Sequence, residues 1–371
     1  MQWKRLIAQQ RIKEVMSSAF DHGTMGHAYL FCGDTGTGTF AAALELSMAL
    51  LCAGETEPPC YRCASCRKVL SFSHPDFHVV MPLSLRKEHK DADGTVSEAG
   101  WNELAARVRE RIEDPYLIPE FSTQPSIPVD WVRETTHAIR RGALEGGRNI
   151  TVIDGIDSMK KESANAMLKT LEEPPPGTLL LLCTSRPHAV LPTILSRCQM
   201  VRFAALPPDV IRSELVSRYS VEEDDPRIDS VIHTGSLGRA WSMLRSSDSD
   251  GRKDAREFWD LITAGDWMPL FETIDELSEY GDFSRYENLF VQLLYGIRNA
   301  FFTKIRGSEN YIMGDHRLSI PARGTASPDS AEVLMRECET AISRIRARGN
   351  SGLVLINFAF SVMEWYHGKK Q

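Results

Sequence analysis

The chain has 371 residues, of which 42% are hydrophobic and 25% charged, and its formal net charge is −7. These values predict a globular protein of two or three domains and exclude a disordered or fibrous chain. The acidic balance argues against duplex DNA binding driven by overall charge. No apolar run has the length of a membrane span and the first residues lack a signal-peptide core, so we expect a cytoplasmic protein with no membrane partner.

The chain up to residue 204 alternates short apolar runs with helix-spaced segments, the pattern of a parallel sheet covered by helices. A first helix is predicted from Ile12 to Phe20, ending near Gly23. A second is expected over Ala41–Leu51, after a glycine-rich turn. The predicted strands are Ala28–Phe31, Phe77–Val80, Ile150–Ile153, Leu179–Cys183 and Met200–Phe203.

A polar stretch with several prolines, residues 84–126, separates the second and third predicted strands. We expect one helix inside this insertion, over Glu98–Glu113. A connection this long in a compact domain is usually either mobile or functional, and the sequence leaves both possibilities open.

Strand signals fade after residue 204, and the rest of the chain predicts helices alone. Residues 205–248 form a small helical lid in this prediction, and residues 249–371 form a helical domain. Ser327 and Pro328 are typical of a helix start. Leu353–Trp365 is apolar nearly all round, as expected for a buried central helix of a bundle. The predicted lid helices are Ile211–Arg218, Ile228–Thr234 and Arg239–Ser246.

The glycine-rich turn has the spacing of a phosphate-binding loop, with Gly33, Gly36 and Gly38 between a strand and a helix. A working loop ends in a lysine that reaches the phosphates and a hydroxyl that binds magnesium. Here Thr39 stands at the lysine position and Phe40 at the hydroxyl position. We therefore expect a degenerate loop in which hydrolysis fails even where some nucleotide still binds, so ATP is a doubtful cofactor. The alternative is that these glycines only turn the chain.

The strand that ends at Ile153 predicts an acidic residue beside this turn. Phosphate-loop ATPases place an aspartate there for magnesium, followed by a glutamate that polarises water. Here Asp154 is followed by Gly155. A second catalytic group is therefore missing from the expected nucleotide site.

Four cysteines, Cys52, Cys60, Cys63 and Cys66, have the spacing of a tetrahedral zinc site. Thiolates in a reducing compartment favour zinc over a disulfide. Four cysteine ligands leave no open position for catalysis, so the predicted cofactor is structural zinc. The other cysteines are predicted to be packing residues: Cys32, Cys183, Cys198 and Cys338.

Three segments carry a family resemblance: His27-Ala-Tyr-Leu-Phe31, Ser163-Ala-Asn-Ala-Met-Leu-Lys-Thr-Leu-Glu-Glu-Pro-Pro-Pro-Gly177 and Pro192-Thr-Ile-Leu-Ser-Arg-Cys198. Together they resemble the bacterial clamp-loader subunits of the AAA+ superfamily. With the degenerate loop, the chain looks most like the delta prime branch of DNA polymerase III. The resemblance covers about residues 1–84 and 127–204 almost continuously. Beyond residue 204 it is limited to short segments.

This resemblance implies an AAA+ parallel-sheet core over residues 1–204 with a zinc module at 52–66. It also implies a helical lid and a helical collar domain through which the subunits assemble. The implied partners are the gamma/tau motor subunits, the delta subunit and the sliding clamp, with primed DNA reached through the complex. A polymerase label would then describe the holoenzyme, because no polymerase active site is evident in this chain.

The Ser196-Arg197-Cys198 triplet carries the functional expectation. In the family this triplet lies at a subunit boundary, and its arginine points at the ATP of a neighbouring motor subunit. Arg197 is therefore the implied catalytic residue, acting in trans as an arginine finger. The lid motif departs from the ATPase relatives, because Gly238 stands where they carry an arginine.

Two alternatives remain open on the sequence alone. One is a divergent but active ATPase of the gamma/tau type, against which Thr39, Phe40 and Gly155 argue. The other is a zinc-dependent DNA-binding protein outside the replisome. The acidic charge and the lack of an aromatic and basic cluster near the cysteines argue against that second function.

Overall fold

The computed structural model describes residues 1–85, 87–121, 125–145, 147–225, 227–245, 250–279, 285–286, 289–294, 296–297, 328–346 and 350–367. Backbone contacts divide the chain into two compact units. The first, here called the core unit, comprises Met1–Pro119, Pro125–Arg218 and Gly235–Ala240, and the remainder is the helical unit. The expected division into core, lid and collar stays a prediction.

A parallel sheet with the strand order β2-β3-β4-β1-β5 forms the centre of the core unit. Its strands β1, β3 and β4 are buried along their whole length, which explains their uninterrupted apolar sequences. Each predicted strand is found within one residue of its expected limits, so the α/β class is confirmed. The strands are β1 (Ala28–Cys32), β2 (Phe77–Val80), β3 (Asn149–Ile153), β4 (Thr178–Thr184) and β5 (Gln199–Arg202).

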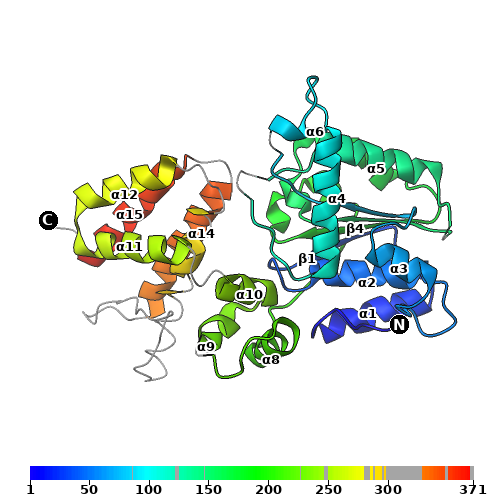
Figure 1. Ribbon diagram of the computed structural model, residues 1–371, viewed down its shortest axis with the longest axis horizontal. Coiled ribbons are helices and arrows are strands. Elements are labelled where there is room, and N and C mark those ends of the chain that lie inside the picture. Colours follow the sequence, from blue (N-terminus) through cyan, green and yellow to red (C-terminus); the bar gives the residue numbers. More distant parts are fainter. Residues whose placement is uncertain are drawn as a thin grey trace. The chain divides into compact units, whose positions relative to one another are not determined.

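Helices surround this sheet (Figure 1). Helix α2 is buried at every position except Leu50, because it lies against the sheet directly after the glycine-rich turn. Helix α6 ends at Glu172, two residues before the first of three prolines, which cannot continue a helix. The core helices are α1 (Gln10–Asp21), α2 (Thr39–Leu51), α3 (Ala64–Leu70), α4 (Glu98–Glu113), α5 (Val129–Arg141), α6 (Lys161–Glu172), α7 (Pro192–Leu195) and α8 (Pro208–Tyr219), with short 3₁₀ segments at Lys87–His89, Ile156–Ser158 and Pro187–Ala189.

The insertion begins and ends at a single backbone pair. Leu83 and Ser126 exchange two backbone hydrogen bonds of 3.1 and 3.0 Å, so residues 84–126 leave the core and return to it at one place. Within this excursion α4 covers Glu98–Glu113, as predicted. The Ser97 hydroxyl caps α4 by accepting a hydrogen bond from the Gly100 amide at 3.3 Å.

A buried carboxylate ties the N-terminal segment to the core. Glu45 on α2 is completely buried and accepts hydrogen bonds from the backbone amides of Lys4, Arg5 and Leu6 at 2.6, 2.7 and 2.9 Å. It also accepts a hydrogen bond from the hydroxyl of Tyr61. The charge of Glu45 is thus compensated by oriented N–H and O–H dipoles rather than by a salt bridge.

The helical unit packs around α15, which contacts α11, α12 and α14 (Figure 1). Helix α14 begins at Pro328 as predicted, while the expected cap Ser327 lies outside the described residues. Helix α15 is buried on one face, but Leu353 and Phe360 on its other face are 58% and 51% exposed. The helix is central, as expected, but it is not buried on every side. The helices after α8 are α9 (Ile228–Val231), a 3₁₀ segment at Ile232–Thr234, α10 (Leu237–Arg245), α11 (Asp250–Ala264), α12 (Trp267–Glu279), α14 (Pro328–Arg346) and α15 (Ser351–His367). Helix α10 begins in the core unit, to which residues up to Ala240 belong.

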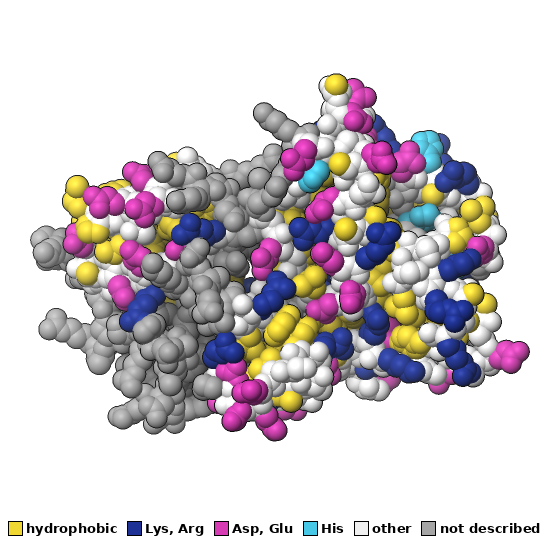
Figure 2. Space-filling model, in the orientation of Figure 1, with side chains coloured by type: hydrophobic (Ala, Val, Ile, Leu, Met, Phe, Trp, Pro, Cys, Tyr) yellow, Lys and Arg dark blue, Asp and Glu magenta, His cyan; other side chains and the backbone are white. Residues whose placement is uncertain are grey.

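Surface charge of both signs is interspersed over α4 and its surroundings on the face seen in Figure 2. The exposed pairs along α4, such as Arg107 with Glu103 at 3.0 Å, belong to this pattern. Among the described residues, no helix is both long and apolar enough to cross a membrane.

We predict that Glu45→Ala lowers the free energy of unfolding by about 3 kcal/mol, because three backbone amides and one hydroxyl lose their acceptor. Urea denaturation followed by circular dichroism measures this change. The exposed Glu14→Ala on α1 is the matched control and should change stability by less than about 0.5 kcal/mol. Equal effects of the two substitutions would contradict the prediction.

Candidate functional site

The glycine-rich loop connects β1 to α2 at the carboxyl edge of the sheet, as predicted. Gly36 and Gly38 have φ angles of +81° and +108°, in the left-handed region that favours glycine, and Gly38 caps α2. The loop is closed on itself, since the Thr37 amide and hydroxyl both donate to the Asp34 carbonyl at 3.1 and 2.7 Å. The second half of the loop, Gly36–Gly38, is buried, with Thr37 only 1% exposed, whereas Asp34 in its first half is exposed.

Thr39 and Phe40, the two substituted positions of the loop, are both buried in the first turn of α2. The Phe40 ring is completely buried and faces the guanidinium of Arg111, which lies 4.6 Å from the ring centroid. An aromatic ring therefore occupies the position of the magnesium-binding hydroxyl, and a cation from the excursion covers it.

Asp154 lies directly after β3 and forms an ion pair with that same arginine. Arg111 Nε is 2.8 Å from Asp154 Oδ2, and the two side chains are 5% and 16% exposed. The carboxylate predicted to bind magnesium thus has an internal cationic partner. Cys183 near the end of β4 is buried, and this burial raises the pKa of its thiol. The loop, Asp154 and Arg111 therefore meet around the ends of three strands.

Segment Gly235–Ala240 also contacts the glycine-rich loop, through Thr35 and Gly36. The Ser236 hydroxyl donates to the Thr35 carbonyl at 2.6 Å, and the Gly238 amide donates to the Gly36 carbonyl at 3.3 Å. A Cβ on Gly36 would lie 2.6 Å from Ser236 Oγ, so this close approach requires glycine.

The polar residue at the end of β4 is engaged in an ion-pair cluster. Thr184 Oγ1 donates to Asp157 Oδ1 at 2.6 Å, and Asp157 also pairs with Arg186 at 2.6 Å. Asp157 is 6% exposed at its side chain, so the cluster is nearly closed to solvent. The Thr184 hydroxyl therefore has a structural partner.

Arg197 follows the short helix α7 and lies on the surface. It takes no part in the contacts of the glycine-rich loop described above. Its Nη2 is 2.7 Å from Glu172 Oε1, at the end of α6, and its Nη1 donates to the Thr193 carbonyl at 2.7 Å. The side chains of Arg197 and Glu172 are 33% and 48% exposed. An ion pair this exposed contributes little, so the guanidinium can exchange Glu172 for another anion at small cost.

The four predicted cysteines come together around one point. Their sulfur atoms lie within 4.8 Å of one another, and the pairs Cys52–Cys63 and Cys60–Cys66 are both 4.0 Å apart. A tetrahedral site with metal–sulfur bonds of about 2.3 Å needs sulfur separations of roughly 3.8 Å. These residues could therefore hold a metal ion, and their soft thiolates suit zinc.

Backbone amides aimed at the sulfurs prepare this cluster for a cation. The amides of Gly54 and Cys60 donate to Cys52 Sγ, both at 3.4 Å. The amides of Arg62 and Cys63 lower the pKa of the Cys60 thiol to about 6, which favours the thiolate form that binds metal. Burial raises the pKa of the Cys66 thiol, so this thiol needs the metal to lose its proton.

Comparison with known proteins identifies the family. A family model described as DNA polymerase III, delta subunit, matches residues 8–207, more than half of the chain. DNA polymerase III subunit delta' of Bacillus subtilis is 30% identical over 286 residues, which cover 73% of each protein. The chain belongs to the delta' family of DNA polymerase III clamp-loader subunits.

Other relatives agree with this assignment. Subunit delta' of Escherichia coli is 26% identical over 265 residues, covering 71% of this chain and 68% of the relative. Subunit tau of Bacillus subtilis is 24% identical over 245 residues, covering 64% of this chain and 36% of the relative. The delta' chain is thus also related to the gamma/tau subunits, as the resemblance of its motifs implied.

The position of Arg111 in the site was not predicted from the sequence. A signal for Arg111 exists, because it shares the buried stripe of α4 with Leu104, Val108 and Ile112. An arginine on an apolar helix face needs a buried anion or several carbonyls as partners. Nothing in the local sequence indicates that the partner is Asp154, which lies 43 residues further along the chain.

We predict that the purified chain contains a stoichiometric amount of zinc, measurable by elemental analysis, and that Cys63→Ser abolishes it. Loss of the metal should lower the free energy of unfolding by several kcal/mol, because binding and folding of such modules are coupled. Cys198→Ser, outside the cluster, is the control and should retain the metal. A fully stable protein that contains no zinc would contradict the prediction.

Proposed function

We propose that this delta' chain is a non-hydrolysing subunit of the clamp loader that supplies Arg197 to ATP bound by a neighbouring motor subunit. It would assemble in the cytoplasm with gamma/tau and delta subunits. The complex would then open the sliding clamp and load it onto primed DNA. The carrying observation is the pairing of Asp154 with Arg111, which leaves the chain's own nucleotide site without a free carboxylate for magnesium.

Loss of hydrolysis is supported by three neighbouring groups. Thr39 offers no positive charge to a phosphate, and the buried Phe40 cannot bind a metal. Asp154 already has a cation 2.8 Å away, so a magnesium ion would have to displace the arginine. Because phosphoryl transfer depends on positioned charge, these changes together remove the means of stabilising the transition state.

The trans role of Arg197 is supported by its exposure and its weak attachment. A planar guanidinium can form two parallel hydrogen bonds to phosphate oxygens, which an ammonium cannot. In the free chain Glu172 holds this guanidinium at the surface. At a subunit boundary the γ-phosphate of a neighbour would replace Glu172 as its partner. Arginine fingers of this kind accelerate hydrolysis by about 10³- to 10⁵-fold.

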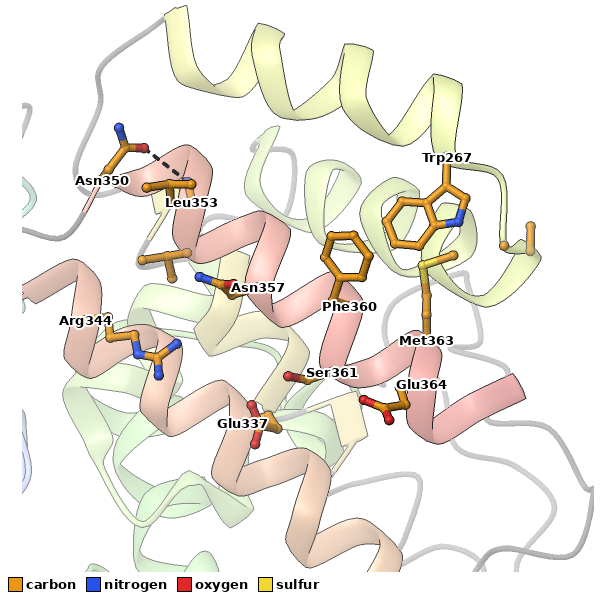
Figure 3. A pocket seen from close by; sticks show the side chains of 13 residues that line it. Trp267, Glu337, Arg344, Asn350, Leu353, Asn357, Phe360, Ser361, Met363 and Glu364 are labelled. Atoms are coloured by element: carbon orange, nitrogen blue, oxygen red, sulfur yellow. Dashed lines mark hydrogen bonds between the residues drawn. The ribbon is translucent and has the colours of Figure 1, made fainter. Parts of the chain in front are cut away.

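Assembly through the helical unit is supported by an open groove of about 1200 Å³ between α12, α14 and α15. Figure 3 shows Trp267 and Phe360 side by side at this groove, with ring centroids 4.5 Å apart. Exposed apolar side chains cluster near it: Met268, Phe271, Leu353 and Phe360. Charged side chains also line the groove, namely Glu337, Arg344 and Glu364. A helical domain of a neighbouring subunit that covered it would bury the apolar side chains and could pair with these charges.

A structural role for zinc in this subunit is supported by the position of the cysteine cluster. Cys63 caps α3. Tyr61 lies between Cys60 and Cys63 in the sequence, and its hydroxyl donates a hydrogen bond to Glu45. Zinc would thereby hold Tyr61 against the carboxylate that organises the N-terminal segment. Four thiolate ligands leave no position for substrate.

We predict that Arg197→Ala lowers ATP hydrolysis at the neighbouring site at least tenfold in a reconstituted loader, because charge on the γ-phosphoryl oxygens loses its partner. Hydrolysis stimulated by clamp and primed DNA measures this effect, and size-exclusion chromatography confirms that assembly is intact. Arg197→Lys should fail to restore the rate, since its ammonium cannot form the bidentate contact.

Two control variants separate a finger from a structural ion pair. Glu172→Gln removes the partner but keeps the arginine, and Arg133→Ala removes an arginine of α5 whose side chain is 63% exposed. Both should retain hydrolysis. A loss in Glu172→Gln equal to that in Arg197→Ala would assign Arg197 to the ion pair alone. Hydrolysis by the isolated wild-type chain at the rate of a motor subunit would favour the alternative of a divergent gamma/tau-like ATPase.

We predict that Phe360→Glu weakens association with the motor subunits at least tenfold, because it places a charge on an apolar surface that assembly would bury. Analytical ultracentrifugation of the mixed subunits measures the change. Leu144→Glu, at an apolar residue of the core unit that is 73% exposed, is the matched control. Unchanged assembly of Phe360→Glu would exclude this groove as the contact.

A further inference from the structure

A segment in the second half of the excursion, residues Arg111–Ile118, packs against the glycine-rich loop and the first turn of α2. This segment, here called the plug, contains the last turn of α4 and the turn that follows it. The turn is fixed locally, because the Leu117 amide donates to the Asp114 carbonyl at 3.1 Å and the Tyr116 amide donates to Asp114 Oδ1 at 3.0 Å. The plug therefore has a defined conformation rather than that of a loose loop.

The arginine of the plug has several partners inside the site. Besides Asp154, Arg111 donates from Nη1 to the carbonyls of Pro115 and Leu117 at 2.5 and 2.9 Å. Its planar group also faces the buried Phe40 ring. A single side chain thus bridges the acidic strand end, the first turn of α2 and the plug's own backbone.

Tyr116 of the plug packs against both the loop, at Gly38, and segment Gly235–Ala240, at Gly238. Its side chain is completely buried, and its hydroxyl would lie 2.9 Å from a Cβ placed on Gly38. The same hydroxyl accepts a hydrogen bond from the Ile7 amide at 2.8 Å. On the other side, the Tyr116 carbonyl is so close to Gly238 that any Cβ there would collide with it. No side chain, including an arginine, can therefore stand at residue 238 while the plug is in place.

We propose that the plug is a built-in occupant of the phosphate site, with Arg111 as the permanent counter-ion of Asp154 and Tyr116 packed against both the loop and segment Gly235–Ala240. The inference rests on the proposed non-hydrolysing function and gives it a physical cause. The substitutions in the loop are then not the only reason why the chain would not hydrolyse ATP. The excursion fills the space in which a nucleotide's phosphates and their metal would bind.

The test combines a restored loop with a removed plug contact in the full chain. The variants are Thr39→Lys, Arg111→Ala and the two together, with Arg107→Ala as control. Arg107 lies one turn before Arg111 on α4, but it is paired only with exposed residues. Binding of mant-ATP with Mg²⁺ is measured by fluorescence, and the amide hydrogen exchange of residues 35–38 and 236–238 is measured by mass spectrometry.

The plug predicts that Thr39→Lys alone binds no mant-ATP, because the site remains filled. The double variant should bind it, with an affinity at least tenfold above that of Thr39→Lys. Exchange in both segments should be at least tenfold faster in Arg111→Ala than in wild type or Arg107→Ala. If Arg111→Ala fails to fold, Arg111→Lys replaces it in the exchange measurement, since lysine keeps the charge but cannot form the three planar contacts.

Two results would overturn the plug: strong mant-ATP binding by Thr39→Lys alone, or exchange in Arg111→Ala equal to that in Arg107→Ala. Nucleotide binding without hydrolysis by the wild-type chain would also overturn the plug but would leave the proposed function intact. Hydrolysis by the wild-type chain would instead overturn the proposed function. The two failures are therefore distinguishable.

Discussion

The buried ion pair between Arg111 and Asp154 is the contact on which the arrangement of the core unit depends. Desolvation of two charges is costly, and it is compensated here because the guanidinium also satisfies two backbone carbonyls and an aromatic face. The excursion, the glycine-rich loop and segment Gly235–Ala240 converge on this pair. Without it, a carboxylate at the edge of the sheet would be left buried and uncompensated.

The sheet and its helices could be predicted from the sequence because their signals are local. Continuous apolar runs mark β1, β3 and β4, and α4 was predicted over Glu98–Glu113, its observed limits. The cysteine cluster was equally predictable, since ligand spacing within a short segment determines its geometry. Family motifs supplied Arg197 and Asp154, whose significance cannot be derived from periodicity.

Long-range partners could not be predicted in the same way. The pairing of Arg111 with Asp154 and the contact of Tyr116 with Gly238 join residues far apart in the chain, and no local pattern specifies which surfaces meet. The sequence showed Gly238 only as a missing arginine. The structure shows a steric reason for it, because the carbonyl of Tyr116 occupies the space that a side chain would need. The glycine at residue 238 therefore fits the packing of this segment against Tyr116 and is more than the loss of an arginine.

The backbone pair of Leu83 with Ser126 has an evolutionary consequence. A segment whose two ends meet at one point can be gained or lost in a single genetic event without shifting the register of the flanking strands. Because the excursion returns to its point of departure, its length can vary while β2 and β3 keep their pairing.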